Sequence, residues 1–422
     1  MNAPMNTAMD RSMRRGACPG LSAPMATGDG LLARLTPAGS TIALDAFAGL
    51  CAAARTHGNG IVEITSRGSI QVRGLSAASA PLFAEAVASF GIEASDGIPV
   101  ATDPLAGLTD ADIFDAHALA AQLRRALAAA PFASRLSAKL SVAIDGGAAL
   151  HLDALTADIR MRVVDNHHAY VSLAGDAATA MPLGAVPLGH AVECVMRLFE
   201  TLATTSPQSR MREAIQGAGL DAFKSSVVAF IVDRPALAAR ATTDPIGVHP
   251  LSSGHDAVGV GLPFGHSDSE TLLHLVAAAR RAGAVGLRTS PGRALLLVGL
   301  SPEGAREMFA AANALGFIVD PADLRRKVVA CAGAPICASG EIAARALAPV
   351  IADAARSLPD GEIIHISGCA KGCAHPAPAP LAVFGRDRRC DVFADGVLSC
   401  SVTADALPER LAQLVRARGG PR

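Results

Sequence analysis

The sequence predicts a duplicated α+β protein, in which two β-α-β-β half-domains are each followed by a larger α/β domain. The main observation is an internal repeat: Leu50–Arg55 matches Leu275–Arg280 at a separation of about 225 residues. Gly74-Leu75 matches Gly299-Leu300 at the same separation. The second observation is that helical and strand patterns follow one another in the same order after each copy. The third is a composition that can fill a large core, with 50% hydrophobic and 18% charged residues.

Each copy of the repeat contains one helix between short strands. Apolar residues recur at helical spacing over Ala43–Thr56 and Ser269–Arg281, so we predict a helix in each copy. Strand-like alternation covers Ile61–Ile64 and Ile70–Val72, with Ser66-Arg67-Gly68 as the turn between them. A unit of this size cannot bury its own sheet, so two units favour a pseudo-two-fold arrangement.

The larger regions alternate helices with strands. In the first we expect helices Asp110–Ala129 and Leu188–Thr204, with strands near Lys139–Ile144, Met161–Val164 and Ala169–Leu173. In the second we expect helices Pro302–Leu315 and Ser339–Ser357, with strands Glu362–Ile366, Leu381–Phe384 and Cys390–Phe393. The predicted division is a loose tail at 1–16, half-domains at 17–84 and 239–304, and α/β domains at 85–238 and 305–416.

The charge balance excludes several functions. Lys+Arg is 37 and Asp+Glu is 38 over 422 residues, which argues against a nucleic-acid partner and against a polybasic membrane surface. Only four of the cations are lysines, and arginine binds carboxylates through a planar fork. No apolar run reaches the roughly 18 residues of a membrane span, and no secretory signal opens the chain. We therefore expect a cytoplasmic protein.

Four of the nine cysteines form two close pairs, Cys331-x5-Cys337 and Cys369-x3-Cys373. Four thiolates on loops can ligate a 4Fe-4S cluster, and the predicted helix after Cys337 would direct its positive end at that cluster. Structural zinc pairs are usually spaced C-x2–4-C, so the first pair fits zinc poorly.

The remaining cysteines show no pairing pattern. Cys51 and Cys194 lie on apolar helix faces and are expected in the core. Cys18 has no assigned role.

These motifs resemble the sulfite/nitrite reductase superfamily. The cysteine loop Ser367–Cys373, the stretch Thr65–Gln71 and Pro104–Gly107 match motifs of that superfamily. The resemblance implies a sulfite/nitrite-reductase-like architecture with ferredoxin-like half-domains. It also implies that Cys331, Cys337, Cys369 and Cys373 hold the 4Fe-4S cluster, and that Arg67 faces the ligand.

The reductases surround their oxyanion substrate with a cluster of basic residues, and this sequence departs from that cluster in two places. Gly97–Thr102 contains no arginine, and Ala138–Ser141 keeps Lys139 but has a serine in place of a second lysine. Six-electron reduction of an oxyanion needs such cations, so the departures disfavour a reductase.

Other stretches resemble the precorrin-3B synthase family, above all Thr27–Leu32, His57–Gly60 and Leu287–Leu297. That resemblance implies that the tetrapyrrole is the substrate and that no sirohaem is held. Precorrin-3A would be hydroxylated at C20 by O2 with γ-lactone formation, in aerobic cobalamin biosynthesis. NADH or an electron-donor protein would supply the electrons. A second, non-haem iron is also implied, and 2-His-1-carboxylate chemistry would suit it.

The candidate site residues follow from these resemblances and from the carboxylates of such a substrate. Anchors for carboxylates are Arg67, Arg73, Arg288, Arg293 and Lys139, and hydrogen-bonding groups are Thr65 and Gln71. Candidate iron ligands are His365, His375, His167, His168 and Asp165, and Lys371 is a candidate to offset the cluster charge.

Two alternatives stay open: a sirohaem-dependent sulfite or nitrite reductase, and a non-catalytic iron–sulfur or tetrapyrrole-binding protein. No GxGxxG follows a strand, so no dinucleotide domain is predicted. The sequence does not single out a catalytic acid or base.

Overall fold

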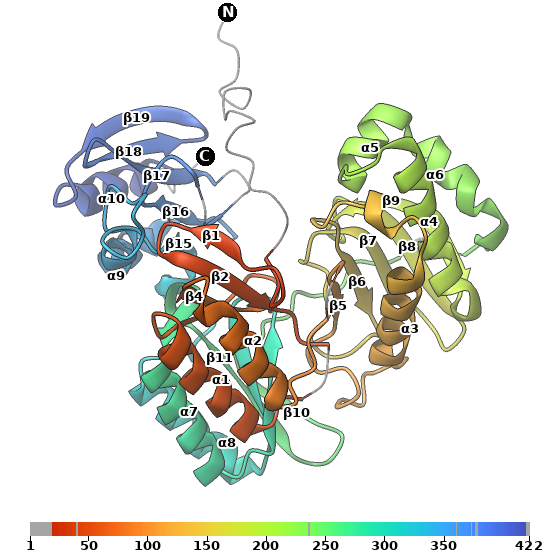
Figure 1. Ribbon diagram of the computed structural model, residues 1–422, viewed down its shortest axis with the longest axis horizontal. Helices are drawn as coiled ribbons and strands as arrows, with labels where there is room; N and C mark the ends of the chain where they lie inside the picture. Colours follow the sequence, from red (N-terminus) through yellow and green to blue (C-terminus); the bar gives the residue numbers. More distant parts are fainter. Residues whose placement is uncertain are drawn as a thin grey trace, which may run out of the picture.

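The structure is a computed structural model that describes residues 19–38, 41–95, 97–234, 237–359, 361–372, 374–375 and 379–418. Three groups of elements surround the centre of the molecule (Figure 1). One contains both half-domains, and the other two are α/β domains, drawn in yellow to green and in blue. Cys18 and Cys373 lie outside the described residues. No helix of the described ranges is both long and apolar enough to cross a membrane.

The two half-domains have the same strand order. The first sheet runs β1 (Met25–Thr27), β2 (Gly30–Leu35), β4 (Ile70–Leu75), β3 (Ile61–Ile64), with helices α1 (Leu44–His57) and α2 (Ser79–Ser89). The second runs β10 (Gly247–Pro250), β11 (Asp256–Gly261), β14 (Ala294–Leu300), β13 (Gly286–Ser290), with helices α7 (Ser269–Arg281) and α8 (Pro302–Ala314). The matched Gly74 and Gly299 both adopt a positive φ, 73° and 82°. The predicted duplication is therefore confirmed.

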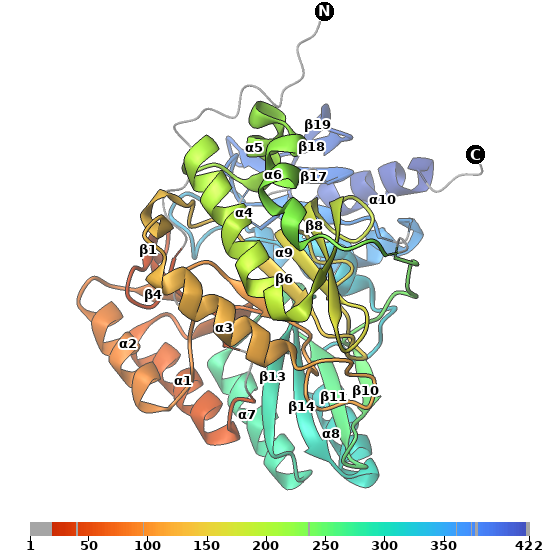
Figure 2. The same ribbon diagram turned by 90° about the vertical axis from the view of Figure 1, so that its right-hand side faces the viewer.

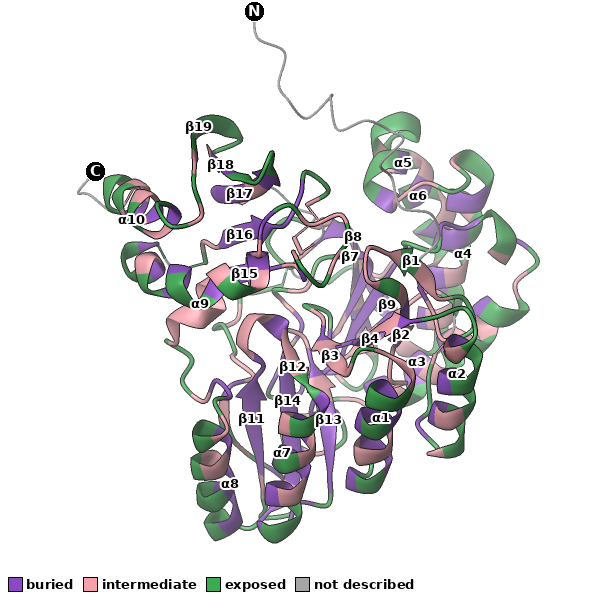
Figure 3. Cartoon of the chain, turned by 60° about the vertical axis from the view of Figure 1, so that its left-hand side comes forward, coloured by how far each residue is buried: buried purple, intermediate pink, exposed green. Residues whose placement is uncertain are grey.

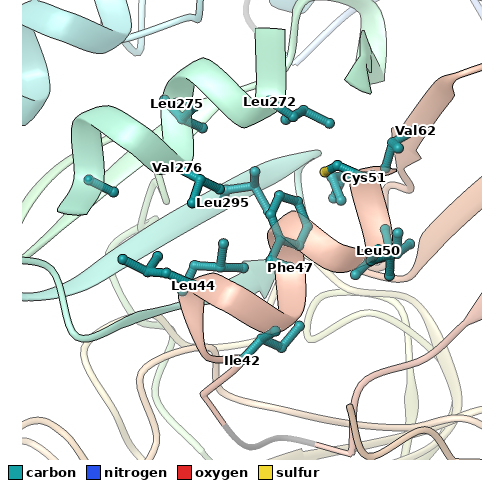
Figure 4. Packing of buried hydrophobic residues seen from close by; sticks show 14 of the residues in the cluster. Ile42, Leu44, Phe47, Leu50, Cys51, Val62, Leu272, Leu275, Val276 and Leu295 are labelled. Carbon is teal, nitrogen blue, oxygen red and sulfur yellow. The ribbon is translucent and has the colours of Figure 1, made fainter. Parts of the chain in front are cut away.

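A shared core joins the half-domains. Phe47 and Leu50 of α1 pack against Leu272 and Leu275 of α7, with Leu295 of β14 beside them (Figure 4). All five side chains are fully buried, and burial of each contributes about 1.5–3 kcal/mol. Cys51 lies in the same core, as predicted.

Backbone pairing between the half-domains brings two of their loops together. The short strand β12 (His266–Asp268) of the second half-domain pairs with β3 of the first. The amide of Gly292 donates to the carbonyl of Ser66 at 3.1 Å, and Arg67 forms an isolated bridge with Pro291. The turns that carry Arg67 and Arg293 therefore face one another.

The two α/β domains also repeat one plan. The first has strands β5 (Val100–Thr102), β6 (Val142–Asp145), β7 (Ala157–Val163), β8 (His168–Gly175), β9 (Met181–Pro187) and helices α3 (Ala116–Ala129), α4 (Ala191–Thr205), α5 (Met211–Ala218), α6 (Leu220–Val227). The second has strands β15 (Val328–Ala330), β16 (Ile364–Ser367), β17 (Leu381–Arg386), β18 (Arg389–Ala394), β19 (Val397–Val402) and helices α9 (Ala344–Ala354), α10 (Leu407–Arg418). In each sheet the first three strands are parallel to one another. The fourth strand is antiparallel to the third, and the fifth is antiparallel to the fourth.

The helices cover these sheets from outside. In the first domain α3 and α4 lie over the sheet, on the side turned toward the viewer in Figure 2. Cys194 of α4 is fully buried in this core, as predicted. Strands are mostly buried while helices expose one face throughout the molecule (Figure 3).

One predicted helix begins later than expected because its first amides bond elsewhere. Over Asp110–Ala129 the helix starts only at Ala116. The amides of Ile113 and Phe114 donate to the carbonyl of Gly146, at 2.9 and 3.2 Å. Tertiary hydrogen bonds therefore outweigh the helical pattern at this end.

The predicted helix Ser339–Ser357 is also shorter, and this corrects an electrostatic argument. It begins at Ala344, because the amide of Glu341 donates to the carbonyl of Gly368 at 2.7 Å instead of joining a helix. Cys337 therefore does not immediately precede a helix, and the expectation that a helix N-terminus faces its sulfur is wrong.

Candidate functional site

A cavity of about 2430 Å³ opens where the half-domains meet both α/β domains. Its wall contains most of the residues singled out from the sequence. These are Thr65, Arg67, Gln71, Arg73, Arg288, Arg293, Cys331, Cys337, Cys369, Lys371, His365 and His375. Lys139 does not belong to the wall: it is exposed in the turn before β6.

Strand order explains why the two cysteine loops meet. Cys331 follows β15 and Cys369 follows β16, and these strands are parallel neighbours. The carboxyl ends of parallel strands share one edge of a sheet, so the two loops emerge side by side. The amide of Gly368 donates to Sγ of Cys331 at 3.0 Å.

Glycines allow close packing around the cysteines. A Cβ at Gly28 would lie 2.3 Å from Sγ of Cys337, so no side chain fits there. A Cβ at Gly368 would lie 2.7 Å from Cα of Gly333, within the opposing cysteine loop. The sulfurs are thus held in a cradle of bare backbone, which suits a bulky inorganic group.

The donor set fits a 4Fe-4S cluster better than a single ion. The sulfurs of Cys331, Cys337 and Cys369 are not all within 4.8 Å of one another. In a zinc site each Zn–S distance is about 2.3 Å, so the sulfurs around one zinc ion lie closer together than 4.8 Å. A cubane cluster spreads its four thiolates over four iron atoms. Cys331, Cys337 and Cys369 could hold such a cluster, and the fourth expected ligand, Cys373, lies outside the described residues.

Within the described residues, one group places three metal-binding side chains within 4.8 Å, namely Asp145, His151 and Asp153. Arg240 already bonds to both carboxylates. The guanidinium thus takes the place that a cation would fill.

Two of the expected anchors are engaged within the protein. Nε and Nη2 of Arg73 donate to the two carboxylate oxygens of Asp29, at 2.8 Å each. Burial acts to raise the pKa of Asp29, but the pair with Arg73 prevails and holds that pKa below its usual value. Arg288 donates to the carbonyl of Ala106 at 2.7 Å and to Oγ1 of Thr41 at 2.9 Å. It therefore ties the first α/β domain to the half-domains.

Arg293 differs from that pair. Arg293 is half-buried and adopts a φ of 64°, and its guanidinium bonds to none of the residues that the structure describes. Burial lowers the pKa of Arg293, because the charged form loses water. Arg67 is exposed, and one of its nitrogens donates to the carbonyl of Thr156 at 2.7 Å. Arg293 thus has unused donors at the cavity.

Gln71 and Thr65 shape the wall. The Gln71 amide is oriented so that its oxygen accepts from Nε of Arg34 at 2.8 Å and its nitrogen donates to Glu63 at 3.1 Å. Oγ1 of Thr65 accepts from the amide of Ser69 at 3.0 Å and so closes the turn around Arg67.

The candidate iron ligands divide into two groups. His365 and His375 both line the cavity, with ring centroids 6.0 Å apart. Burial lowers the pKa of His365 to about 4, so this ring is neutral at pH 7. No third donor among the described residues completes a metal-binding group with them.

The other group lies away from the cavity wall, at the turn between β7 and β8. There Nδ1 of His168 lies 3.0 Å from Asp165, and Arg234 pairs with the same carboxylate. His167 is exposed beside them. This group is a surface ion pair.

Sequence reasoning missed Asp103, a fully buried acid in the cavity wall. Its Oδ2 accepts from the amide of Gly146 at 2.5 Å, while its Oδ1 finds no donor among the described residues. Burial, and then the charge of Asp145, hold the pKa of Asp103 well above its usual value. In the sequence, Asp103 could have been singled out because it directly precedes the matched motif Pro104-Leu105-Ala106-Gly107.

Comparison with known proteins gives consistent relatives. The family model for the nitrite/sulfite reductase ferredoxin-like half domain matches residues 23–90. A precorrin-3B synthase from Sinorhizobium sp is 36% identical over 383 residues, 89% of this chain and 81% of that protein. A ferredoxin–nitrite reductase from Synechococcus elongatus is 26% identical over 411 residues, 85% of this chain and 80% of that protein. The Mycobacterium tuberculosis NirA structure shares the fold, with a TM-score of 0.71 at 20% identity over 92% of this chain and 80% of that one.

Proposed function

The chain belongs to the precorrin-3B synthase family, and from this premise we propose that it hydroxylates precorrin-3A at C20 with O2 and forms the γ-lactone with the ring A acetate. The observation that carries the proposal is that one cavity is lined both by arginines and by the cysteine loops. A polycarboxylate substrate and a redox group could meet there. The product would serve aerobic cobalamin biosynthesis.

We propose that Cys331, Cys337, Cys369 and Cys373 hold a 4Fe-4S cluster. When bound, the cluster supplies electrons one at a time, which dioxygen requires because it reacts slowly with closed-shell organic molecules. The glycine cradle and the spread of the three described sulfurs support this assignment. NADH, directly or through an electron-donor protein, is the proposed source of electrons.

The substrate carboxylates are assigned to Arg293 and Arg67. Both line the cavity, and their planar forks suit carboxylates. The volume of about 2430 Å³ exceeds the 300–1000 Å³ of ordinary small-ligand pockets, which suits a macrocycle. Thr65 and Gln71 would support that wall. Arg73 is paired with Asp29 and Glu63, and Lys139 lies outside the wall, so neither is kept in the proposed set.

An additional non-haem iron does not find a complete ligand set among the described residues. His365 and His375 would supply only two donors. No step of the proposed reaction is assigned to such an iron.

The absorption spectrum of the anaerobically purified protein tests the proposed function. Broad iron–sulfur absorption without sirohaem bands is expected. Stoichiometric sirohaem with sulfite or nitrite turnover would establish the reductase alternative, which the 26% identical nitrite reductase keeps open. Binding of precorrin-3A with no oxygen-dependent product would instead indicate a non-catalytic binding protein. The cytoplasmic location stays a prediction, which cell fractionation would check.

A further inference from the structure

We propose that Arg345 and Arg73 raise the reduction potential of the cluster, and that Glu63 between them limits this effect and holds both in position. The inference rests on the proposed 4Fe-4S cluster. It assigns a role to residues that neither motif spacing nor the family resemblance connected with the cysteines.

A chain of four charged side chains is formed by Asp29, Arg73, Glu63 and Arg345. Nη2 of Arg345 lies 2.8 Å from one oxygen of Glu63, and Nη1 of Arg73 lies 3.7 Å from the other. Arg73 then pairs with Asp29 at 2.8 Å. The four side chains are at most 17% exposed, so solvent screens them weakly. The chain connects the N-terminal strands, the first half-domain and helix α9.

Arg345 carries the observation that points to a missing partner. Its Nε and Nη1 are buried and find no acceptor among the described residues. Charged donors are strongly destabilised when they are buried without a partner. Nδ1 of His266, which lines a smaller cavity together with Arg345, also finds no partner among the described residues, so the two side chains do not satisfy one another. An anionic acceptor is therefore missing beside Arg345.

The cysteines give the position of that acceptor. Arg73 and Glu63 line the same cavity as Cys331 and Cys337. Glu63 in turn pairs with Arg345 at 2.8 Å. An anionic cluster bound through these two sulfurs would supply the acceptor.

The segment Thr27–Gly30 fixes this arrangement in place. The carbonyl of Gly28 accepts from the amide of Ala338 at 2.7 Å, and Gly28 lies against the sulfur of Cys337. The next residue, Asp29, holds Arg73. One short segment therefore joins the cysteine loop to the ion chain.

The signs of the expected effects follow from charge. Reduction adds one negative charge to the cluster, so a nearby cation stabilises the reduced state and raises the potential. Removing the charge of Arg345 lowers the potential. Removing the charge of Glu63 leaves both guanidinium groups less compensated and raises it. Simple damage to packing would not shift two neighbouring variants in opposite directions.

The test is a redox titration followed by EPR on the anaerobically purified full chain. Arg345→Gln is expected to shift the midpoint potential to more negative values, and Glu63→Gln to more positive values. The matched control is Arg280→Gln, because Arg280 forms an exposed ion pair with Asp45 on the half-domain helices. The control is expected to keep the wild-type potential.

The outcomes separate two failures. If wild-type protein contains no iron–sulfur signal, the proposed cluster itself is wrong. If the cluster is present and neither variant shifts its potential, or both shift it in the same direction, the cluster stands and this inference is overturned. Should Arg345→Gln lose its iron, Arg345→Lys, which keeps the charge, must retain iron at a near-wild-type potential, and Glu63→Gln must still shift it upward.

Discussion

The two α/β domains use one strand-end arrangement to hold two different side chains. In the first, Asp103 follows β5, and the amide of Gly146 after β6 donates to its carboxylate at 2.5 Å. In the second, Cys331 follows β15, and the amide of Gly368 after β16 donates to its sulfur at 3.0 Å. The duplication therefore supplies a backbone donor beside the first strand in both copies. The side chain placed there decides whether the copy offers a carboxyl group or a thiol group.

Asp103 and Cys331 occupy equivalent strand ends, but the side chains around them differ. Asp103 faces a second buried carboxylate, Asp145, and the first domain offers no cysteine to the cavity within the described ranges. Cys331 is joined there by Cys337 and Cys369. The two domains thus share a backbone scaffold, and the loops of the second domain alone supply it with cysteines at the cavity.

The largest difference between the copies should appear on removing a thiolate from the second. Cys369→Ala is expected to abolish cluster iron, because one ligand is lost and its loop also carries Gly368. Iron analysis and EPR of the reduced protein measure this. Cys194→Ala in the core of the first domain is the control; it should keep its iron and lose about 1–2 kcal/mol of stability. An unchanged EPR spectrum in Cys369→Ala would refute the ligand assignment.

The next largest effect concerns the cradle around the cysteines. Gly28→Ala would place a Cβ 2.3 Å from the Cys337 sulfur and is expected to weaken cluster retention about tenfold, as for other residues that support metal ligands. Release of iron to a chelator measures it. Gly189→Ala in the first domain has open space around it and should behave as wild type. Equal iron release from both variants would show that the close packing at Gly28 does not matter.

A smaller effect is expected at the substrate wall. Arg293→Gln removes a charged fork with unused donors, and a charge-assisted hydrogen bond contributes about 1.5–3 kcal/mol. Precorrin-3A should then bind at least about tenfold more weakly, by anaerobic spectral titration. Lys139→Gln, outside the cavity wall, should change the affinity little. A larger loss for Lys139→Gln than for Arg293→Gln would reverse our assignment.

The last prediction concerns the acid of the first copy. The raised pKa of Asp103 keeps the folded carboxyl protonated while the unfolded one ionises above its usual pKa of 3.8, so wild-type stability falls as pH rises through that range. Asp103→Asn keeps an acceptor for Gly146 and removes the titration. Relative to wild type, the variant should gain stability as the pH rises above about 4, with a slope of up to about 1.4 kcal/mol per pH unit in urea unfolding. A difference that is independent of pH would show that Asp103 ionises normally.

The repeat was predictable from the sequence because it depends on local patterns. The helix expected over Ser269–Arg281 matches α7 residue for residue, and the matched glycines Gly74 and Gly299 share their backbone conformation. The same patterns failed at Ser339, where the amide of Glu341 bonds to a loop that is distant in sequence. Periodicity carries no information about such tertiary hydrogen bonds.

The candidate site was predictable in its cysteines and less so in its charges. Four close cysteines on loops have few other uses in a chain of this kind. Arg73, by contrast, looked like a substrate anchor until Asp29, 44 residues away, was found to occupy its fork. The buried pair of Asp103 and Gly146 likewise joins residues 43 apart. These partnerships arise from tertiary packing within the first half-domain and within the first α/β domain, which no single-segment pattern encodes.

Mass spectrometry of the product formed from precorrin-3A under ¹⁸O2, with NADH and an electron-donor system, tests the central claim most directly. The account predicts a product that carries one ¹⁸O atom in the hydroxyl group at C20 and an unlabelled lactone oxygen from the acetate. Its formation should depend on the cluster and cease in Cys369→Ala. Unchanged precorrin-3A from protein with a full complement of iron and sulfide, or product without the label, would contradict it.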